Sequence, residues 1–368
     1  MVAIQGVARD LAQGVLVERA AGRDETEAFP LEEARMLAER GLMGVAIDPA
    51  YGGLGLGKVG YAVAIREIAA ACASTAVTMA VTNMVGEMID TYGTPEQKEA
   101  YLPLLLSGER PIGSFCLSEA QSGTDAAALR AKAVREGDNY RLSGTKMWVT
   151  SGAHCSLALI MARTDDSHKN RGITSFLVDP QSAGYSVGKA EEKMGLRGSN
   201  TVSVNLDDCV VGSDRVLAGE GRGFYVAMTA LDGGRIGIGA QSLGIARGAV
   251  EAAARVVHGG RKRTQSVEKN LADAATALEA GWLMVMRAAY LREQGKPMTR
   301  EAAMAKVFAT ESACKAVDCA HEIVGGTGTT EEWTVERALR DVRITRIYEG
   351  TSEIQRHVIA RELLKGKA

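Results

Sequence analysis

The spacing of apolar residues changes twice along this chain of 368 residues, and this change constrains the fold more than any other feature. Long segments with helical spacing fill residues 1 to about 110 and return from about 223 onward. Between about 112 and 216, short alternating segments are separated by turn signals about every 8–12 residues. The pattern predicts a mainly α-helical protein with a central β domain.

Three domains are expected from this pattern. They are an N-terminal helical domain at 1–111, a small antiparallel β-barrel or sandwich at 112–217, and a C-terminal four-helix bundle at 218–368. The expected helices cover 31–42, 61–73, 74–89, a segment from Pro95 capped by Thr94, 224–257, 267–294, 299–324, and 334–347 with a continuation to 364. The expected strands cover 112–117, 131–135, 140–142, 147–150, 157–162, 174–178 and 202–206.

The charge and the cysteines narrow the function classes. A net charge of −2 and a pI of about 6.3 do not favour binding to nucleic acid or to an anionic membrane. The sequence has neither a signal peptide pattern nor an apolar stretch long enough to span a membrane. None of the six cysteines forms a C-x-x-C pair, and no Cys/His cluster has metal-ligand spacing. We therefore expect reduced thiols, no metal and a cytoplasmic location.

The segment 347–356 near the C-terminus is the most informative about chemistry. A helical run ends at Glu349, and Gly350 follows and breaks the helix. Ser352 is expected to cap a new helix, with Gln355 reaching back to it. A carboxylate fixed beside a helix N-terminus, which attracts anions, suits proton abstraction next to a phosphate-bearing cofactor. A surface Glu before a helix cap is the alternative.

Two segments of the β region could bind a flat ring. The loop after the first strand, 118–125, is rich in hydroxyl groups and includes Ser118 and Thr124. The strand that ends at Thr150 carries Trp148, which offers an aromatic surface. Together they indicate a site for a planar cofactor. Taken singly, the tryptophan is more often a core residue and the loop is more often an ordinary loop.

Further candidates lie in the C-terminal region. Arg235, three residues after Asp232, is placed near the start of that helical region, where the helix dipole disfavours a cation and an anionic ligand would explain it. A surface arginine is the alternative. The glycines Gly325 and Gly326 lie between helices, so they do not form a Rossmann fingerprint. They are expected to permit close backbone approach. The basic run 261–263 is expected to be a solvated turn or a phosphate contact.

Five motifs, in this order along the chain, resemble those of the acyl-CoA dehydrogenases, which are flavoproteins that desaturate acyl-CoA thioesters. The resemblance is greatest to the short-chain group. The motifs are Ala50-Tyr51-Gly52-Gly53-Leu54-Gly55, Ser118-Glu119-x-x-Ser122-Gly123-Thr124-Asp125, Gly144-Thr145-Lys146-x-Trp148-Val149-Thr150, Lys193-Met194-Gly195-Leu196-Arg197-Gly198-Ser199 and Tyr348-Glu349-Gly350-Thr351-Ser352-Glu353-Ile354-Gln355. The resemblance extends over about residues 29–364. Its implied fold agrees with the helix–sheet–helix order.

The resemblance implies a role for each matching residue. Glu349 is the implied catalytic base, because Gly234 occupies the position where some branches carry the base instead. The implied FAD contacts are Leu117, Ser118, Trp148, Thr150, Gln265, Glu322, Gly325, Gly326, Thr351 and Glu353. The implied substrate contacts are Ser118, Thr124, Asp232, Arg235, Tyr348 and Gly350.

The family chemistry gives each of these groups a task. The base takes the α-proton, and the β-hydrogen leaves as hydride to flavin N5. The thioester oxygen accepts hydrogen bonds from the backbone N–H of the base and from a ribityl hydroxyl, which act as an oxyanion hole. An electron-transfer flavoprotein is the implied electron acceptor, and the implied assembly is a homotetramer or dimer.

The sequence departs from the family pattern at one end of the bundle. The segment from Arg255 to Gln265 is about six residues short and lacks an Arg-x-x-Phe-Gly motif that contacts the FAD of a neighbouring subunit. Glu322 replaces a family glutamine and would repel a pyrophosphate by about 1 kcal/mol. Arg261 or Arg263 is expected to compensate. These changes leave open a flavin-poor subunit of a hetero-oligomer.

The expected substrate is a short acyl-CoA, straight or branched. This expectation rests on the resemblance and on Met79, Thr82 and Met84, which fall in the expected pocket helix. The absence of Arg between residues 74 and 89 disfavours a substrate with a second carboxylate. An acyl-CoA oxidase remains a further alternative, because the sequence does not reveal how O₂ reaches a flavin.

Overall fold

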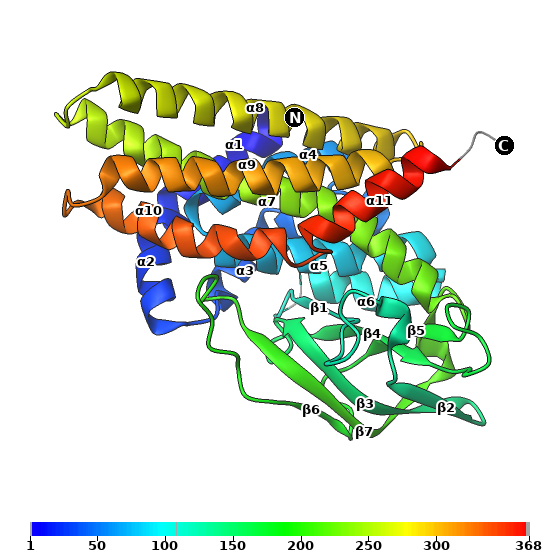
Figure 1. Ribbon diagram of the computed structural model, residues 1–368. Coiled ribbons are helices and arrows are strands. Elements are labelled where there is room, and N and C mark those ends of the chain that lie inside the picture. Colours follow the sequence, from blue (N-terminus) through cyan, green and yellow to red (C-terminus); the bar gives the residue numbers. More distant parts are fainter. Residues whose placement is uncertain (1, 108, 366–368) are drawn as a thin grey trace.

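The computed structural model describes residues 2–107 and 109–365. Helices precede and follow a single mixed β-sheet, which confirms the predicted fold class. Figure 1 shows the sheet lying below a layer of long helices, with α5 and α6 between them and the sheet. A continuous hydrophobic core joins residues from all three regions.

The N-terminal region is helical. Its helices are α1 (Val2–Leu11), α2 (Val17–Thr26), α3 (Leu31–Glu39), α4 (Gly57–Ala71), α5 (Ala73–Tyr92) and α6 (Pro95–Leu106), with a π-helical turn η1 (Ala12–Leu16) between the first two. The N-cap predicted at Thr94 is present and forms a capping box, since its hydroxyl and the Gln97 side chain each bond the other residue's backbone N–H. α5 is buried along nearly its whole length, as its apolar sequence predicts.

The central sheet has the order β6-β7-β3-β2-β4-β5-β8, with β1 paired to β4. Its strands are β1 (Gly113–Cys116), β2 (Lys132–Glu136), β3 (Asn139–Thr150), β4 (Leu157–Arg163), β5 (Ile173–Val178), β6 (Tyr185–Val187), β7 (Thr201–Gly212) and β8 (Val216–Leu217). Most pairs are antiparallel, as expected, but β1 and β2 both pair with β4 in parallel. The predicted strands 140–142 and 147–150 are two parts of β3.

The C-terminal region is formed by long helices that pack on one another. They are α7 (Gly223–His258), α8 (Gln265–Glu293), α9 (Thr299–Val324), α10 (Thr330–Asp341) and α11 (Ser352–Leu364), with a 3₁₀ turn η6 (Val342–Arg346) after α10. α7 packs against α4, α5, α8, α9 and α10. It therefore contacts helices of both helical regions (Figure 1).

A buried carboxylate links the first helix to this framework. Glu67 on α4, which is 2 % exposed, accepts hydrogen bonds from Gln5, Arg9 and Arg247. Burial alone raises its pKa, but hydrogen bonds from Arg247, Arg9 and Gln5 outweigh burial and lower it to about 2. α1, α4 and α7 are thus held together by one ionised side chain. Within the described ranges, no helix has the combination of length and apolarity that crossing a bilayer requires.

Candidate active site

A cavity of about 880 Å³ lies between α5, α7, the ends of β1 and β3, and the segment around η6. It brings together many of the residues predicted for the site from distant parts of the chain. Those that line it are Leu117, Ser118, Thr124, Trp148, Thr150, Arg235, Tyr348, Glu349, Gly350 and Thr351. Their individual assignments to flavin or substrate stay predictions.

Glu349 stands at a sharp corner of the backbone. The helical path ends before it, and both Glu349 (φ 55°) and Gly350 (φ 91°) have left-handed conformations. The predicted capping is wrong in one detail. Thr351, not Ser352, is the N-cap of α11, because its hydroxyl accepts the Ile354 N–H. A left-handed glutamate is strained, so other groups must hold it in place.

Two buried side chains, those of Gln355 and Lys306, donate hydrogen bonds to the backbone of this corner. The Gln355 amide donates to the carbonyl oxygens of Glu349 (3.1 Å) and Gly350 (2.9 Å). The Lys306 ammonium group on α9 donates to the Gly350 carbonyl at 2.8 Å. Both side chains are fully buried. Gln355 therefore fixes the corner itself rather than reaching back to Ser352.

The surroundings of Glu349 keep its carboxyl group partly protonated near neutral pH. Burial raises its pKa from 4.5 to about 7, against the opposing effects of Arg235, Lys306 and Lys58. Arg235 is ion-paired with Asp232, and Lys58 is ion-paired with Glu87. Lys306 has no ion pair within the described chain, and burial lowers its pKa to about 8. Among the ion pairs of the described residues, Arg235 and Lys58 therefore each have a carboxylate partner and Lys306 has none.

Polar atoms of Glu349 are left without partners. Its Oε2 atom is buried and accepts no hydrogen bond, and its backbone N–H donates to no acceptor in the described parts of the chain. Buried polar groups are normally paired, so an unpaired acceptor beside an unpaired donor on a cavity wall indicates a place for a ligand. A Cβ atom at Gly234 on α7 would overlap Oε2, so the carboxylate needs glycine there.

The opposite wall comes from the sheet, where Trp148 lies in a β-bulge. Between Lys146 and Val149, β3 has one residue more than its partner β7, and Trp148 has φ 60°. The bulge turns the indole into the cavity, where it stays 61 % exposed. The prediction of an aromatic surface here therefore holds, and the core alternative for this tryptophan is wrong.

A buried ion pair fixes the loop beside Trp148. Lys146, which is fully buried, bonds the Leu117 carbonyl (3.2 Å) and Glu119 Oε1 (2.7 Å). Glu119 also accepts the backbone N–H groups of Arg130 and Ala131. Burial alone raises the pKa of Glu119, but Lys146 and these N–H groups outweigh it and hold the pKa below its usual range. The hydroxyl-rich loop is thus rigid where it meets the cavity.

The 193–199 loop forms a third part of the wall. Its Leu196 has φ 49°, and the Leu196 N–H donates to Asp341 Oδ1 at 2.6 Å. Gly195 lies so close to the backbone at Arg340 that a Cβ atom would overlap it. Burial raises the pKa of Asp341 to about 6. The Tyr348 hydroxyl, on the same side of the cavity, donates to Gln241 on α7.

Several predicted site residues do not line the cavity. Asp232 instead accepts hydrogen bonds from Arg235 and Thr299, and so holds the arginine that does line it. Arg235 lies in the middle of α7, not near a helix start, and is 6 % exposed, so both the dipole argument and the surface alternative are wrong. Glu353 is exposed beside Thr351.

The predicted FAD contacts Gln265, Glu322, Gly325 and Gly326 lie at the far end of the bundle. Gln265 begins α8, Glu322 is exposed on the last turn of α9, and the glycines follow it. Arg261 donates to the Gly325 carbonyl at 3.4 Å, which joins the short connection 259–264 to this loop. Contacts to a neighbouring subunit's FAD stay a prediction for these residues.

Three features of the site are absent from the sequence-based predictions: Lys306, Lys146 and the role of Gln355 in holding the corner. Lys306 left a signal, since it is a lone cation in the apolar run 302–309. On α5, Met84 lines the cavity as expected, but Met79 and Thr82 do not. Thr82 instead accepts the Gly113 N–H in the core.

Comparison with known proteins identifies the family. Three family models match in order: acyl-CoA dehydrogenase N-terminal domain at 2–109, middle domain at 114–209 and C-terminal domain at 221–364. The chain belongs to the acyl-CoA dehydrogenase family. Enzymes of this family are FAD-dependent oxidoreductases that act on CH–CH groups.

Individual relatives support this membership over nearly the whole chain. The human mitochondrial short-chain specific acyl-CoA dehydrogenase is 42 % identical over 97 % of this chain and 88 % of its own. The butyryl-CoA dehydrogenase of Megasphaera elsdenii has a TM-score of 0.93 at 35 % identity, covering 98 % of this chain and 97 % of its own. A glutaryl-CoA dehydrogenase from Mycobacterium smegmatis in complex with FADH2 has a TM-score of 0.92 at 27 % identity, covering 99 % and 94 %.

The cavity of this acyl-CoA dehydrogenase fits a flat cofactor together with a ligand. Ser118, Trp148 and Thr150 line the wall formed by the sheet region. Glu349, whose Oε2 atom has no partner, lines the wall formed by the C-terminal helical region. A tricyclic ring needs an apolar face with a few hydrogen-bonding groups at its edge, and this wall offers both. The donor set therefore suits the flavin of FAD.

Proposed function

We propose that this chain catalyses the FAD-dependent α,β-dehydrogenation of a short-chain acyl-CoA to the trans-2-enoyl-CoA, with Glu349 as the base. The observation that carries the proposal is the buried carboxylate whose Oε2 atom has no partner on the cavity wall. A general base works best when its pKa lies near the working pH, and burial raises the pKa of Glu349 to about 7.

The residues around Glu349 have defined tasks in this proposal. The Oε2 atom accepts the α-proton of the thioester. The unpaired Glu349 N–H donates to the thioester oxygen and stabilises the charge that develops there. Lys306 and Gln355 keep the corner at Gly350 in place, so that the carboxylate and the N–H both keep their positions.

The sheet side of the cavity holds the cofactor. Leu117, Ser118, Trp148 and Thr150 are the residues that contact the flavin ring, with Thr351 nearer the sugar and phosphate part. Bound FAD supplies the acceptor for the hydride that leaves the β-carbon. Burial of the reacting atoms between the sheet and α7 excludes water from the proton transfer.

The substrate and partners follow from the same site. Arg235, held by Asp232, together with Thr124 contacts the CoA portion of the thioester, and Tyr348 and Gly350 line the cavity beside the base. The resemblance to the family adds an electron-transfer flavoprotein as electron acceptor. A dimer or homotetramer is the proposed assembly.

The test is anaerobic bleaching of the flavin by butyryl-CoA. The wild-type protein should lose its yellow absorbance, whereas Glu349→Gln should retain FAD and fold but lose nearly all turnover. A matched control is Glu99→Gln, because Glu99 is an exposed glutamate on α6. A Glu349→Gln variant with more than about a tenth of the normal kcat contradicts the role of Glu349 as base.

A second candidate is a flavin-poor subunit of a hetero-oligomer. Two observations favour it: the connection between α7 and α8 has only the residues 259–264, and the Glu322 carboxylate is exposed at the end of α9. The ratio of FAD to chain in the purified protein separates the two candidates. About one FAD per chain supports the homo-oligomeric enzyme, and a colourless protein that gains activity with a second chain supports the alternative.

A further inference from the structure

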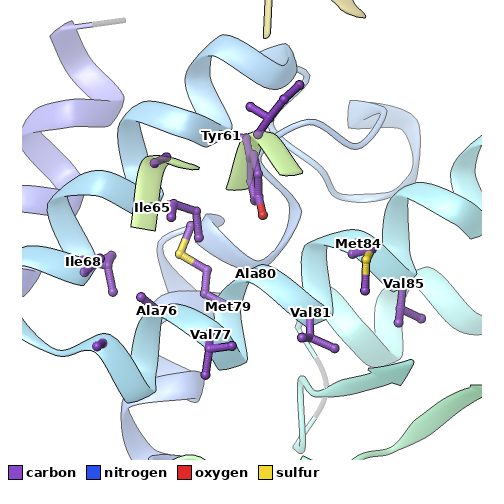
Figure 2. Close-up of a cluster of buried hydrophobic side chains, with 14 of the residues drawn as sticks. Tyr61, Ile65, Ile68, Ala76, Val77, Met79, Ala80, Val81, Met84 and Val85 are labelled. Atoms are coloured by element: carbon purple, nitrogen blue, oxygen red, sulfur yellow. The ribbon is translucent and has the colours of Figure 1, made fainter. Parts of the chain in front are cut away.

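One residue of the cavity lining comes from α4, and its side chain is large. Tyr61 on α4 lines the cavity and is 2 % exposed. Figure 2 shows its hydroxyl pointing from α4 toward α5, the helix that carries Val77, Ala80 and Val81. The hydroxyl makes no hydrogen bond with any residue in 2–107 or 109–365. Tyr61 therefore fills space instead of tying two elements together.

The Tyr61 hydroxyl reaches the backbone of α7. A Cβ atom at Gly237 would overlap the hydroxyl, just as a Cβ atom at Gly234 would overlap Glu349 Oε2. Helical residues three apart have Cβ positions about 5–6 Å from each other. The phenol and the carboxylate therefore touch α7 about one turn apart, and the space between them has room for only a few carbon atoms.

The ring is also held from behind. The Lys58 ammonium group lies 4.4 Å from the ring centre and is ion-paired with Glu87. Burial raises the pKa of the Tyr61 phenol, and Glu87 and Glu349 raise it further, so the phenol stays neutral. The ring is thus fixed by a charged cluster that does not itself line the cavity.

The α5 residues that line the cavity are small or branched aliphatic except for Met84. They are Val77, Ala80 and Val81, and Gly234 and Ile238 line it from α7. Removing the Tyr61 ring would therefore lengthen the cavity more than shortening any of these side chains.

We propose that Tyr61 sets the length of acyl chain that this enzyme accepts, by closing the cavity about one helical turn beyond Glu349. The inference rests on the proposed function and deepens it, because it assigns the short-chain limit to one residue. The bulk of the ring excludes a longer chain, and the hydroxyl has no part in recognition.

The test measures binding rather than turnover. Dissociation constants of butyryl-CoA and octanoyl-CoA are measured by calorimetry on the FAD-loaded protein in a Glu349→Gln background, where the ligands do not react. Tyr61→Ala should lower the ratio of the octanoyl to the butyryl constant at least about tenfold, because even one methylene group in an apolar pocket changes selectivity about 10–200-fold. Tyr61→Phe is the matched control and should leave the ratio unchanged.

Two outcomes overturn the inference. One is an unchanged ratio in a Tyr61→Ala protein that retains its FAD absorbance. The other is an equal change in Tyr61→Phe, which would assign selectivity to the hydroxyl. If neither the wild type nor the Glu349→Gln protein binds any acyl-CoA, the proposed function fails instead, which is a distinct result.

A second variant decides the matter if Tyr61→Ala does not fold. Gly237→Ala keeps the ring but forces the phenol toward the acyl side, and alanine suits the interior of α7. The affinity for hexanoyl-CoA should then fall at least about tenfold relative to that for propionyl-CoA. Equal effects on both ligands contradict the proposed closure.

Discussion

Replacing Glu349 by glutamine should make the folded protein more stable above pH 7, although it removes the base. Burial raises the pKa of Glu349 from 4.5 to about 7 in the folded protein. The folded state therefore binds this proton more tightly than the unfolded state does. The stability that comes from the bound proton is full below pH 4.5 and is lost as the pH rises through 7.

The size of this effect follows from the difference between the two pKa values. A difference of about 2.5 corresponds to about 3 kcal/mol, since one pKa unit is about 1.4 kcal/mol. Glutamine has nearly the same shape and no charge at any pH. The stability of Glu349→Gln relative to the wild type should therefore increase by about 2–3 kcal/mol between pH 5 and pH 8.

The assay is urea unfolding of both FAD-loaded proteins at pH 5, 6, 7 and 8, followed by tryptophan fluorescence and far-UV circular dichroism at the same excess of FAD. Glu99→Gln, on the exposed face of α6, should show no comparable pH dependence. A difference between Glu349→Gln and wild type that stays constant with pH, or that grows toward pH 5, refutes the reasoning. Such a result would mean that the carboxyl group is solvated in the folded protein.

Three further predictions concern the charges around the site and the core. Lys306→Met should move the acid limb of the pH profile of kcat/KM upward by about 1–2 pH units, because a cation that favours the ionised base is lost. An acid limb at the same pH as in the wild type contradicts this role of Lys306. Glu67→Gln should lower the free energy of unfolding at pH 7 by about 3 kcal/mol, because the pKa of Glu67 in the folded protein is about 2. The loss should shrink as the pH falls from 4.5 toward 2. A loss that is independent of pH contradicts the claim that ionised Glu67 holds α1, α4 and α7 together. Lys146→Met should leave the buried Glu119 carboxylate without its cation and reduce the FAD retained after gel filtration several-fold, as read from absorbance. Full retention of FAD contradicts the role of Lys146 in fixing the loop at Leu117.

Much of the fold could be predicted because the relevant signals are local. Helical spacing located α7, α8 and α9 to within a few residues, and alternating segments located most of the strands. The parallel pairing of β1 with β4 was missed, because these strands are about 40 residues apart and turn signals describe only neighbouring strands. The short strand β6 has too few residues to show a period.

The candidate site was predicted less completely than the fold. Glu349 and Gly350 were found because a helix break leaves a mark in the sequence itself. Trp148 was found as an aromatic residue, but the bulge that turns it into the cavity depends on the register of β3 against β7. α5 lines the cavity as expected, but the residues that face the cavity cannot be chosen from the sequence of a helix that is apolar all round, and Met79 and Thr82 do not line it.

The amino-acid sequence by itself determined the order of helical and sheet regions, the corner that presents Glu349 and the resemblance to one enzyme family. These features depend on residues that are close together in the chain. Only the tertiary structure decided that Tyr61 lines the cavity, that Lys306 and Gln355 hold the corner, and that burial raises the pKa of Glu349 to about 7. Burial and Coulomb interactions depend on distances in space, and here those distances join α4, α7, α9 and the segment before α11.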